Sequence, residues 1–107
     1  MERYGSVIQL EASKLDEYRE LHKNIWPRVA KTITKCNIRN YSIYHKDGFL
    51  FSYFEYIGKD FKKDMGKMAA DPITQKWWDV CKPMQTPLDT RNEGEWWAEM
   101  EEVFHQD

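Results

Sequence analysis

Three side chains suited to acid–base and binding chemistry recur at four-residue intervals near the N-terminus: Tyr18, His22 and Trp26. In a helix, residues at this spacing lie one above another, so a phenol, an imidazole and an indole would share one face. The imidazole titrates near neutral pH and can carry a proton, while the phenol can donate a hydrogen bond and the indole offers an apolar wall. This combination suits a small polyhydroxylated ligand.

Aromatic residues are the excess in the composition. Five Trp, six Tyr and five Phe make up 15% of the chain, and four of the tryptophans form the doublets Trp77-Trp78 and Trp96-Trp97. Aromatic rings fill hydrophobic cores, but they also stack on the C–H faces of sugars and anchor interfaces. Adjacent residues of a helix point about 100° apart, so we expect one member of the first doublet to belong to the core.

The charge balance argues against two classes of partner. Sixteen basic and 18 acidic side chains give a formal net charge of -2, which offers no general attraction to nucleic acid or to an anionic membrane surface. No apolar run is long enough to span a bilayer, and the N-terminal residues lack the apolar core of a signal peptide, so we expect a cytoplasmic protein. Cys36 and Cys81 lack the spacing of a metal site or a disulfide framework and are interpreted as packed thiols.

The segment with the Tyr18 and His22 pair is predicted to be a long helix. Ser13, followed by Asp16, resembles an N-cap with an acidic first turn. Pro27 falls inside the apolar pattern, where it removes a backbone hydrogen bond, so we expect a kink over residues 24–26.

Four segments have the composition of strands. Residues 4–10 and 38–45 are rich in β-branched and aromatic residues, Lys46-Asp47-Gly48 supplies a turn, and residues 49–57 complete a hairpin. Alternation over residues 97–104 indicates a closing strand.

The remaining segments complete a known order of elements. Residues 59–70 form an amphipathic pattern, and Asp71-Pro72 resembles the start of another helix, which is followed by an exposed loop over residues 83–94. The order βαββαβ predicts one α+β domain over residues 1–107, with a ferredoxin-like antiparallel sheet and helices on one face. The other face would be bare, so we expect a homodimer that packs sheet against sheet.

Several motifs together resemble the L-rhamnose mutarotase family, and the similarity covers nearly the whole chain. Its most specific part is the spacing in the first half. The motifs are Tyr18-x-x-x-His22, Asn24-Ile25-Trp26-Pro27, Asn40-Tyr41-Ser42-Ile43-Tyr44, Gln75-Lys76-Trp77-Trp78 and Glu101-Glu102-Val103-Phe104-His105.

This resemblance implies a dimeric α/β-barrel isomerase that interconverts the α and β anomers of a deoxy-hexose without a metal or cofactor. It also implies that His22 is the proton donor and that Tyr18, Tyr41, Trp77 and Trp78 bind the sugar.

Two positions depart from the pattern of the enterobacterial members. Asn24 stands where those members have a proline, and Trp96-Trp97 adds aromatic bulk to residues 93–98. The first change leaves the chemistry intact. The second concerns a loop near the expected pocket mouth, so the predicted substrate is L-rhamnose or a related 6-deoxy sugar such as L-fucose.

The chemistry of anomer exchange fits these residues. The anomeric hydroxyl must lose a proton and the ring oxygen must gain one, and an imidazole can serve either step. Such help is worth roughly a hundred- to ten-thousandfold in rate. Tyr18 could orient a hydroxyl or complete a proton relay, Tyr41 could add a hydrogen bond, and Trp77 and Trp78 could cover the sugar's C–H face and 6-methyl group.

The other titratable groups are assigned structural roles. His45 and His105 are expected in solvent, and Glu99, Glu101 and Glu102 in solvent or at an interface, because neighbours on a strand face opposite ways. Two alternatives stay open: a cofactor-independent monooxygenase or heme-degrading enzyme of the same architecture, and a sugar-binding module without catalysis.

Overall fold

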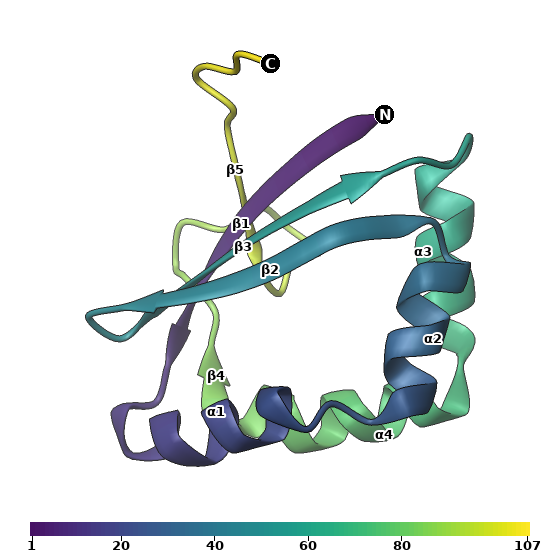
Figure 1. Ribbon diagram of the computed structural model, residues 1–107. Helices are drawn as coiled ribbons and strands as arrows, with labels where there is room; N and C mark the ends of the chain where they lie inside the picture. Colours follow the sequence, from purple (N-terminus) through teal and green to yellow (C-terminus); the bar gives the residue numbers. More distant parts are fainter.

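A computed structural model describes residues 1–107 as one antiparallel sheet with helices on a single face (Figure 1). The strand order is β2-β3-β1-β4, and β5 also pairs with β1. This is the ferredoxin-like arrangement expected from the order of elements. The strands are β1 (Glu2–Leu10), β2 (Ile38–Lys46), β3 (Phe49–Tyr56), β4 (Gln85–Thr86) and β5 (Ala98–Met100).

Four α-helices cover the inner face of the sheet. In Figure 1, α1 and α4 run across the bottom of the view, and α2 and α3 stand at its right. No helix is long and apolar enough to cross a membrane. The helices are α1 (Leu15–Lys23), α2 (Pro27–Lys35), α3 (Phe61–Ala70) and α4 (Pro72–Cys81), with short 3-10 turns η1 (Ala12–Lys14) and η2 (Lys82–Met84).

The predicted long helix is two helices, which corrects the expectation of a kink. Helix α1 ends at Lys23, and Pro27 is the first residue of α2, where its missing N–H costs no hydrogen bond. Trp26 has extended backbone and therefore does not share the α1 face with His22. The expected cap at Ser13 is also wrong, because Lys14 precedes α1 without a side-chain cap.

Two other helix starts follow the sequence signals. Asp71 accepts a hydrogen bond from the backbone N–H of Thr74 at 2.8 Å, and Pro72 opens α4, as expected. Asp60 caps α3 in the same way. At the other end of the chain the closing strand is shorter than expected, because β5 pairs only with residues 5–7 of β1 and the residues after Met100 are exposed.

A β-bulge interrupts β2 and decides which of its side chains face the helices. Arg39 pairs with Glu55 and Ser42 pairs with Tyr53, so two residues of β2 oppose one residue of β3. Asn40 takes up the extra length with a positive φ of 50°, which Asn tolerates better than most residues. After the bulge, Tyr41 lies on the helix side of the sheet against Phe54, with ring centroids 5.6 Å apart.

The core lies between the sheet and the helices. Its buried aliphatic side chains come from β1, β3 and α2, and they form one cluster with buried side chains of α1 and α4. The eight buried members of this cluster are Ile8, Leu10, Tyr18, Val29, Leu50, Trp77, Cys81 and Met84.

Candidate active site

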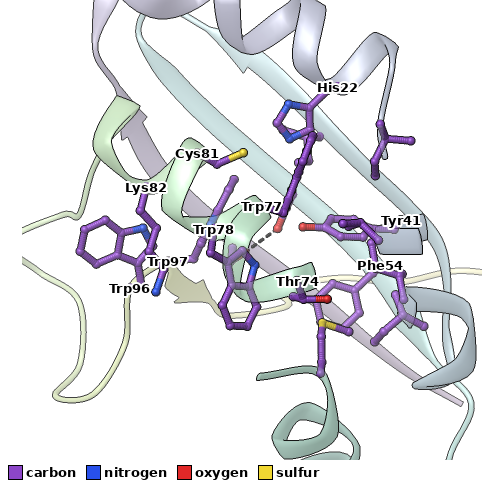
Figure 2. Close-up of a pocket in the computed structure, with 18 of the residues that line it drawn as sticks. His22, Tyr41, Phe54, Thr74, Trp77, Trp78, Cys81, Lys82, Trp96 and Trp97 are labelled. Atoms are coloured by element: carbon purple, nitrogen blue, oxygen red, sulfur yellow. Dashed lines mark hydrogen bonds between the residues drawn. The ribbon is translucent and has the colours of Figure 1, made fainter. Parts of the chain in front are cut away.

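A cavity of about 630 Å³ opens between the sheet and the helices (Figure 2). Side chains of β1, β2, β3, all four helices and the loop before β5 line it. All five site residues expected from the sequence are in this lining: Tyr18, His22, Tyr41, Trp77 and Trp78.

Helix α1 brings His22 and Tyr18 together one turn apart. Their rings stack with centroids 4.1 Å apart, and Nδ1 of His22 lies 2.9 Å from the carbonyl oxygen of Tyr18. A carbonyl can only accept, so Nδ1 carries the hydrogen and Nε2 keeps a lone pair in the neutral ring. Burial lowers the pKa of His22 below its ordinary value of 6.5, which favours this neutral form.

The hydroxyl of Tyr18 is held by Gln85, a residue far along the chain. Tyr18 is 4% exposed, and its oxygen accepts a hydrogen bond of 3.1 Å from Nε2 of Gln85. Burial raises the pKa of Tyr18 far above its ordinary value, so the phenol stays protonated. Its hydrogen remains available to another acceptor.

Tyr41 enters the cavity from β2. Although 43% of its surface is exposed, Figure 2 shows its hydroxyl pointing into the cavity, and desolvation there raises its pKa to about 12. The hydroxyl makes no hydrogen bond within the protein, which leaves it free for a ligand.

The two tryptophans of α4 have different environments. Trp77 is 6% exposed and packs edge-on against His22 at 5.2 Å and Trp26 at 5.1 Å between ring centroids. It is the core member of the doublet and supports the imidazole from behind. Trp78 is half-buried, and its indole stands in the cavity between Thr74 and Lys82 (Figure 2).

Several lining residues were not identified from the sequence as site residues, among them Gln85 and Lys82. Gln85 accepts a hydrogen bond of 2.8 Å from Nε1 of Trp96 as well as donating to Tyr18. The ammonium of Lys82 lies 5.1 Å from the ring centroid of Trp78 and 5.5 Å from that of Trp96. The sequence places the Trp96-Trp97 doublet in a loop near the expected pocket mouth, and both rings line the cavity.

The histidines and glutamates that were expected in solvent or at an interface do not line the cavity. His45 is exposed beside the hairpin turn, and His105 pairs with Asp107 at 2.8 Å. Glu102 forms an ion pair of 3.0 Å with Arg3. No group of three His, Cys, Asp or Glu side chains is placed to hold a metal ion.

The cavity combines one basic nitrogen with two hydroxyl donors. Nε2 of His22 can remove a proton from a hydroxyl, and Tyr18 and Tyr41 can each donate to a second oxygen. Burial raises the pKa of the Cys81 thiol to about 11, so it offers no thiolate nucleophile near neutral pH. The arrangement therefore suits proton transfer on a hydroxylated ligand.

Comparison with known proteins agrees with this chemistry. A family model described as L-rhamnose mutarotase matches residues 3–106. The L-rhamnose mutarotases of Oceanobacillus iheyensis and Phocaeicola vulgatus are 35% and 34% identical over 108 and 115 aligned residues, and each alignment covers 100% of both chains.

Two solved structures are similar in fold. L-rhamnose mutarotase FA22100 from Formosa agariphila superposes with a TM-score of 0.78 and 22% identity over 100% of both chains. Tetracenomycin F2 cyclase from Streptomyces glaucescens reaches 0.76 with 10% identity, over 100% of this chain and 98% of its own. At these identities the likeness concerns the fold alone.

Proposed function

We propose how this chain, which belongs to the L-rhamnose mutarotase family, interconverts the α and β anomers of its sugar in the cavity between the helices and the sheet. The observation that carries the proposal is the hydrogen bond from Nδ1 of His22 to the Tyr18 carbonyl, because it leaves Nε2 as the basic nitrogen.

Ring opening needs two proton transfers. The hydroxyl proton on the anomeric carbon passes to Nε2 of His22 while the bond between that carbon and the ring oxygen breaks and a carbonyl forms. The ring oxygen takes a proton from a phenol, for which Tyr18 and Tyr41 are the candidates. Both phenols have raised pKa values and are fully protonated before the reaction.

Ring closure runs the same steps in reverse. Rotation about the bond next to the open carbonyl presents its other face to the hydroxyl, which attacks while the phenolate recovers its proton. The imidazolium of His22 then returns its proton to the carbonyl oxygen. His22 is the base on opening and the proton donor on closing, and no covalent intermediate forms.

The indoles provide the apolar side of the site. Trp78 stands in the cavity and can cover the C–H face and the methyl group of a 6-deoxy sugar. Trp77 contributes mainly through its contact with the His22 ring. The substrate proposed for this site is L-rhamnose. Because Trp96 and Trp97 add bulk to the cavity lining, L-fucose is the second sugar to test.

Saturation-transfer NMR on the anomeric signals of L-rhamnose and L-fucose tests this proposal. The wild type should accelerate exchange, and His22→Ala should return the rate to that of buffer while sugar binding persists. His45→Ala, which alters an exposed histidine, should keep the wild-type rate. Exchange retained in His22→Ala would remove His22 from this role, and saturable binding without acceleration by the wild type would indicate a binding module.

We also propose a homodimer. The sheet face opposite the helices exposes Tyr44, Phe51 and Met100, and no element of the chain covers it. A second copy with the same apolar face is the self-complementary partner that would bury it. A cytoplasmic location is consistent with two unpaired cysteines, Cys36 and Cys81.

A further inference from the structure

We propose that Gln85 is a positioning residue that holds the Tyr18 hydroxyl as a hydrogen-bond donor toward the sugar, and that Trp96 fixes the Gln85 amide in the orientation this requires. The inference rests on the function proposed above and adds two residues to its machinery. Neither residue belongs to the motifs that carry the family resemblance.

Only one assignment of donors and acceptors fits these two hydrogen bonds. The indole Nε1–H of Trp96 can only donate, and it lies 2.8 Å from Oε1 of Gln85. The amide oxygen is therefore engaged by the indole, and the amide nitrogen faces Tyr18 at 3.1 Å. Because an amide N–H can only donate, the Tyr18 oxygen must accept.

This geometry settles where the hydroxyl hydrogen of Tyr18 can go. The hydroxyl cannot donate to the amide nitrogen, and it makes no other hydrogen bond within the protein. Tyr18 lines the cavity, so its hydrogen is directed to whatever acceptor occupies that cavity. Without the Gln85 amide, the same hydroxyl could equally accept from a sugar hydroxyl and lose its defined role.

The contacts also place donor and base beside each other. The Tyr18 ring stacks on the His22 ring at 4.1 Å, so the donor hydrogen and the basic Nε2 approach the same ligand from adjacent side chains. In a pyranose, the anomeric hydroxyl and the ring oxygen are attached to the same carbon. A base and a donor held side by side are matched to those two oxygens.

The fold holds Gln85 in place independently of its side chain. Its backbone pairs with Leu10 of β1, so β4 fixes the position from which the amide reaches Tyr18. Trp96 comes from the loop before β5, where its ring also lies under the Lys82 ammonium. The hydroxyl of an α1 residue is thus oriented by two segments from the other end of the chain.

The sharpest test reverses the polarity of the contact without changing its shape. In Gln85→Glu, a carboxylate accepts from both Trp96 and Tyr18, so the Tyr18 hydrogen turns away from the sugar. We expect kcat/KM for anomer exchange to fall about 10- to 100-fold, mostly in kcat. The control Gln106→Glu makes the same change at an exposed position after β5 and should keep wild-type kinetics.

A double-mutant cycle separates positioning from a general structural effect. Tyr18→Phe removes the hydroxyl through which Gln85 acts, so Gln85→Glu should cause no further loss in that background. Trp96→Phe, which frees the amide to turn over, should lose part of the activity and be non-additive with Gln85→Glu. Additive losses, or a Gln85→Glu enzyme with wild-type kcat, would overturn the inference.

One readout does not depend on turnover. In ¹H–¹⁵N spectra, the Trp96 indole signal should shift in Gln85→Leu, which cannot accept its hydrogen, and hold its position in Gln106→Leu. An unshifted indole signal would overturn the proposed amide orientation even in a protein that exchanges no anomers. A wild type that fails to accelerate exchange while the indole shift appears would instead count against the proposed function.

Discussion

Tyr18 fixes His22 in two ways at once: its carbonyl oxygen lies 2.9 Å from Nδ1 of the imidazole, and its phenol ring stacks on that imidazole at 4.1 Å. The first contact determines the tautomer and the second determines the plane of the ring. Both arise because the residues are one helical turn apart on α1. The basic nitrogen therefore has a set direction before any ligand binds.

The pH dependence of exchange should report the neutral imidazole. Burial lowers the pKa of His22 below 6.5, so the ring stays unprotonated as the pH falls through that value. The catalysed rate, after subtraction of the buffer rate, should be flat at neutral pH and decline only at more acidic pH, once His22 is protonated. A catalysed rate that rises on acidification would assign the imidazolium, rather than the imidazole, to ring opening.

Removal of the Tyr41 hydroxyl should affect catalysis and leave stability unchanged. The hydroxyl points into the cavity and has no partner in the protein, so Tyr41→Phe loses only a contact with the ligand. We expect kcat/KM to fall up to about tenfold, with no change in melting temperature. Tyr44→Phe is the matched control, because Tyr44 is exposed on the same strand, and an equal loss there would contradict the assignment.

The two adjacent tryptophans should respond differently to truncation. Trp77→Ala opens a hole in the core beneath His22 and should cost about 3–5 kcal/mol of unfolding free energy, measured by urea denaturation. Trp78→Ala removes a half-buried wall and should raise KM several-fold to about tenfold with a much smaller stability loss. Equal stability losses would mean that both indoles belong to the core.

A charge placed on the outer sheet face should dissociate the proposed dimer. Phe51 lies on that face beside Tyr44, its partner in the β2–β3 ladder. Phe51→Glu should shift the sedimentation coefficient from dimer to monomer, because burial of an unpaired carboxylate is costly. Lys62→Glu, an exposed change on α3, should remain dimeric, and a monomeric wild type would refute the proposal directly.

Local signals in the sequence were enough for most elements. The turn at Asp47-Gly48 and the start of α4 at Asp71-Pro72 depend on residues within four positions of each other, so each could be identified from its own segment. Ser13 was misleading because η1 occupies the segment where a cap was expected. Pro27 marked the right place, but the sequence did not distinguish a bent helix from two helices.

Long-range contacts explain what the sequence did not reveal. Gln85 forms hydrogen bonds with Tyr18 and Trp96, which are 67 and 11 residues away in the sequence. Nothing in the segment around Gln85 marks it as a candidate site residue. Trp26 follows His22 by four residues, the spacing of one helical face. Helix α1 ends before Trp26, however, and the Trp26 ring packs against Trp77. The resemblance to a family supplied the remaining candidates, Tyr41, Trp77 and Trp78, which periodicity alone would have left among ordinary aromatic residues, and all three line the cavity.

The extra residue at Asn40 has a consequence for how one strand can serve two surfaces. Strict alternation from Ile38 would turn Tyr44 toward the helices and Tyr41 away from them. The extra residue reverses both, so that Tyr41 lines the cavity and Tyr44 is exposed on the outer face of the sheet. The left-handed backbone of Asn40 thus decides which of the two tyrosines lies in the cavity and which lies on the outer face. A one-residue shift in the pairing of β2 would exchange the positions of Tyr41 and Tyr44 without any change in the sequence.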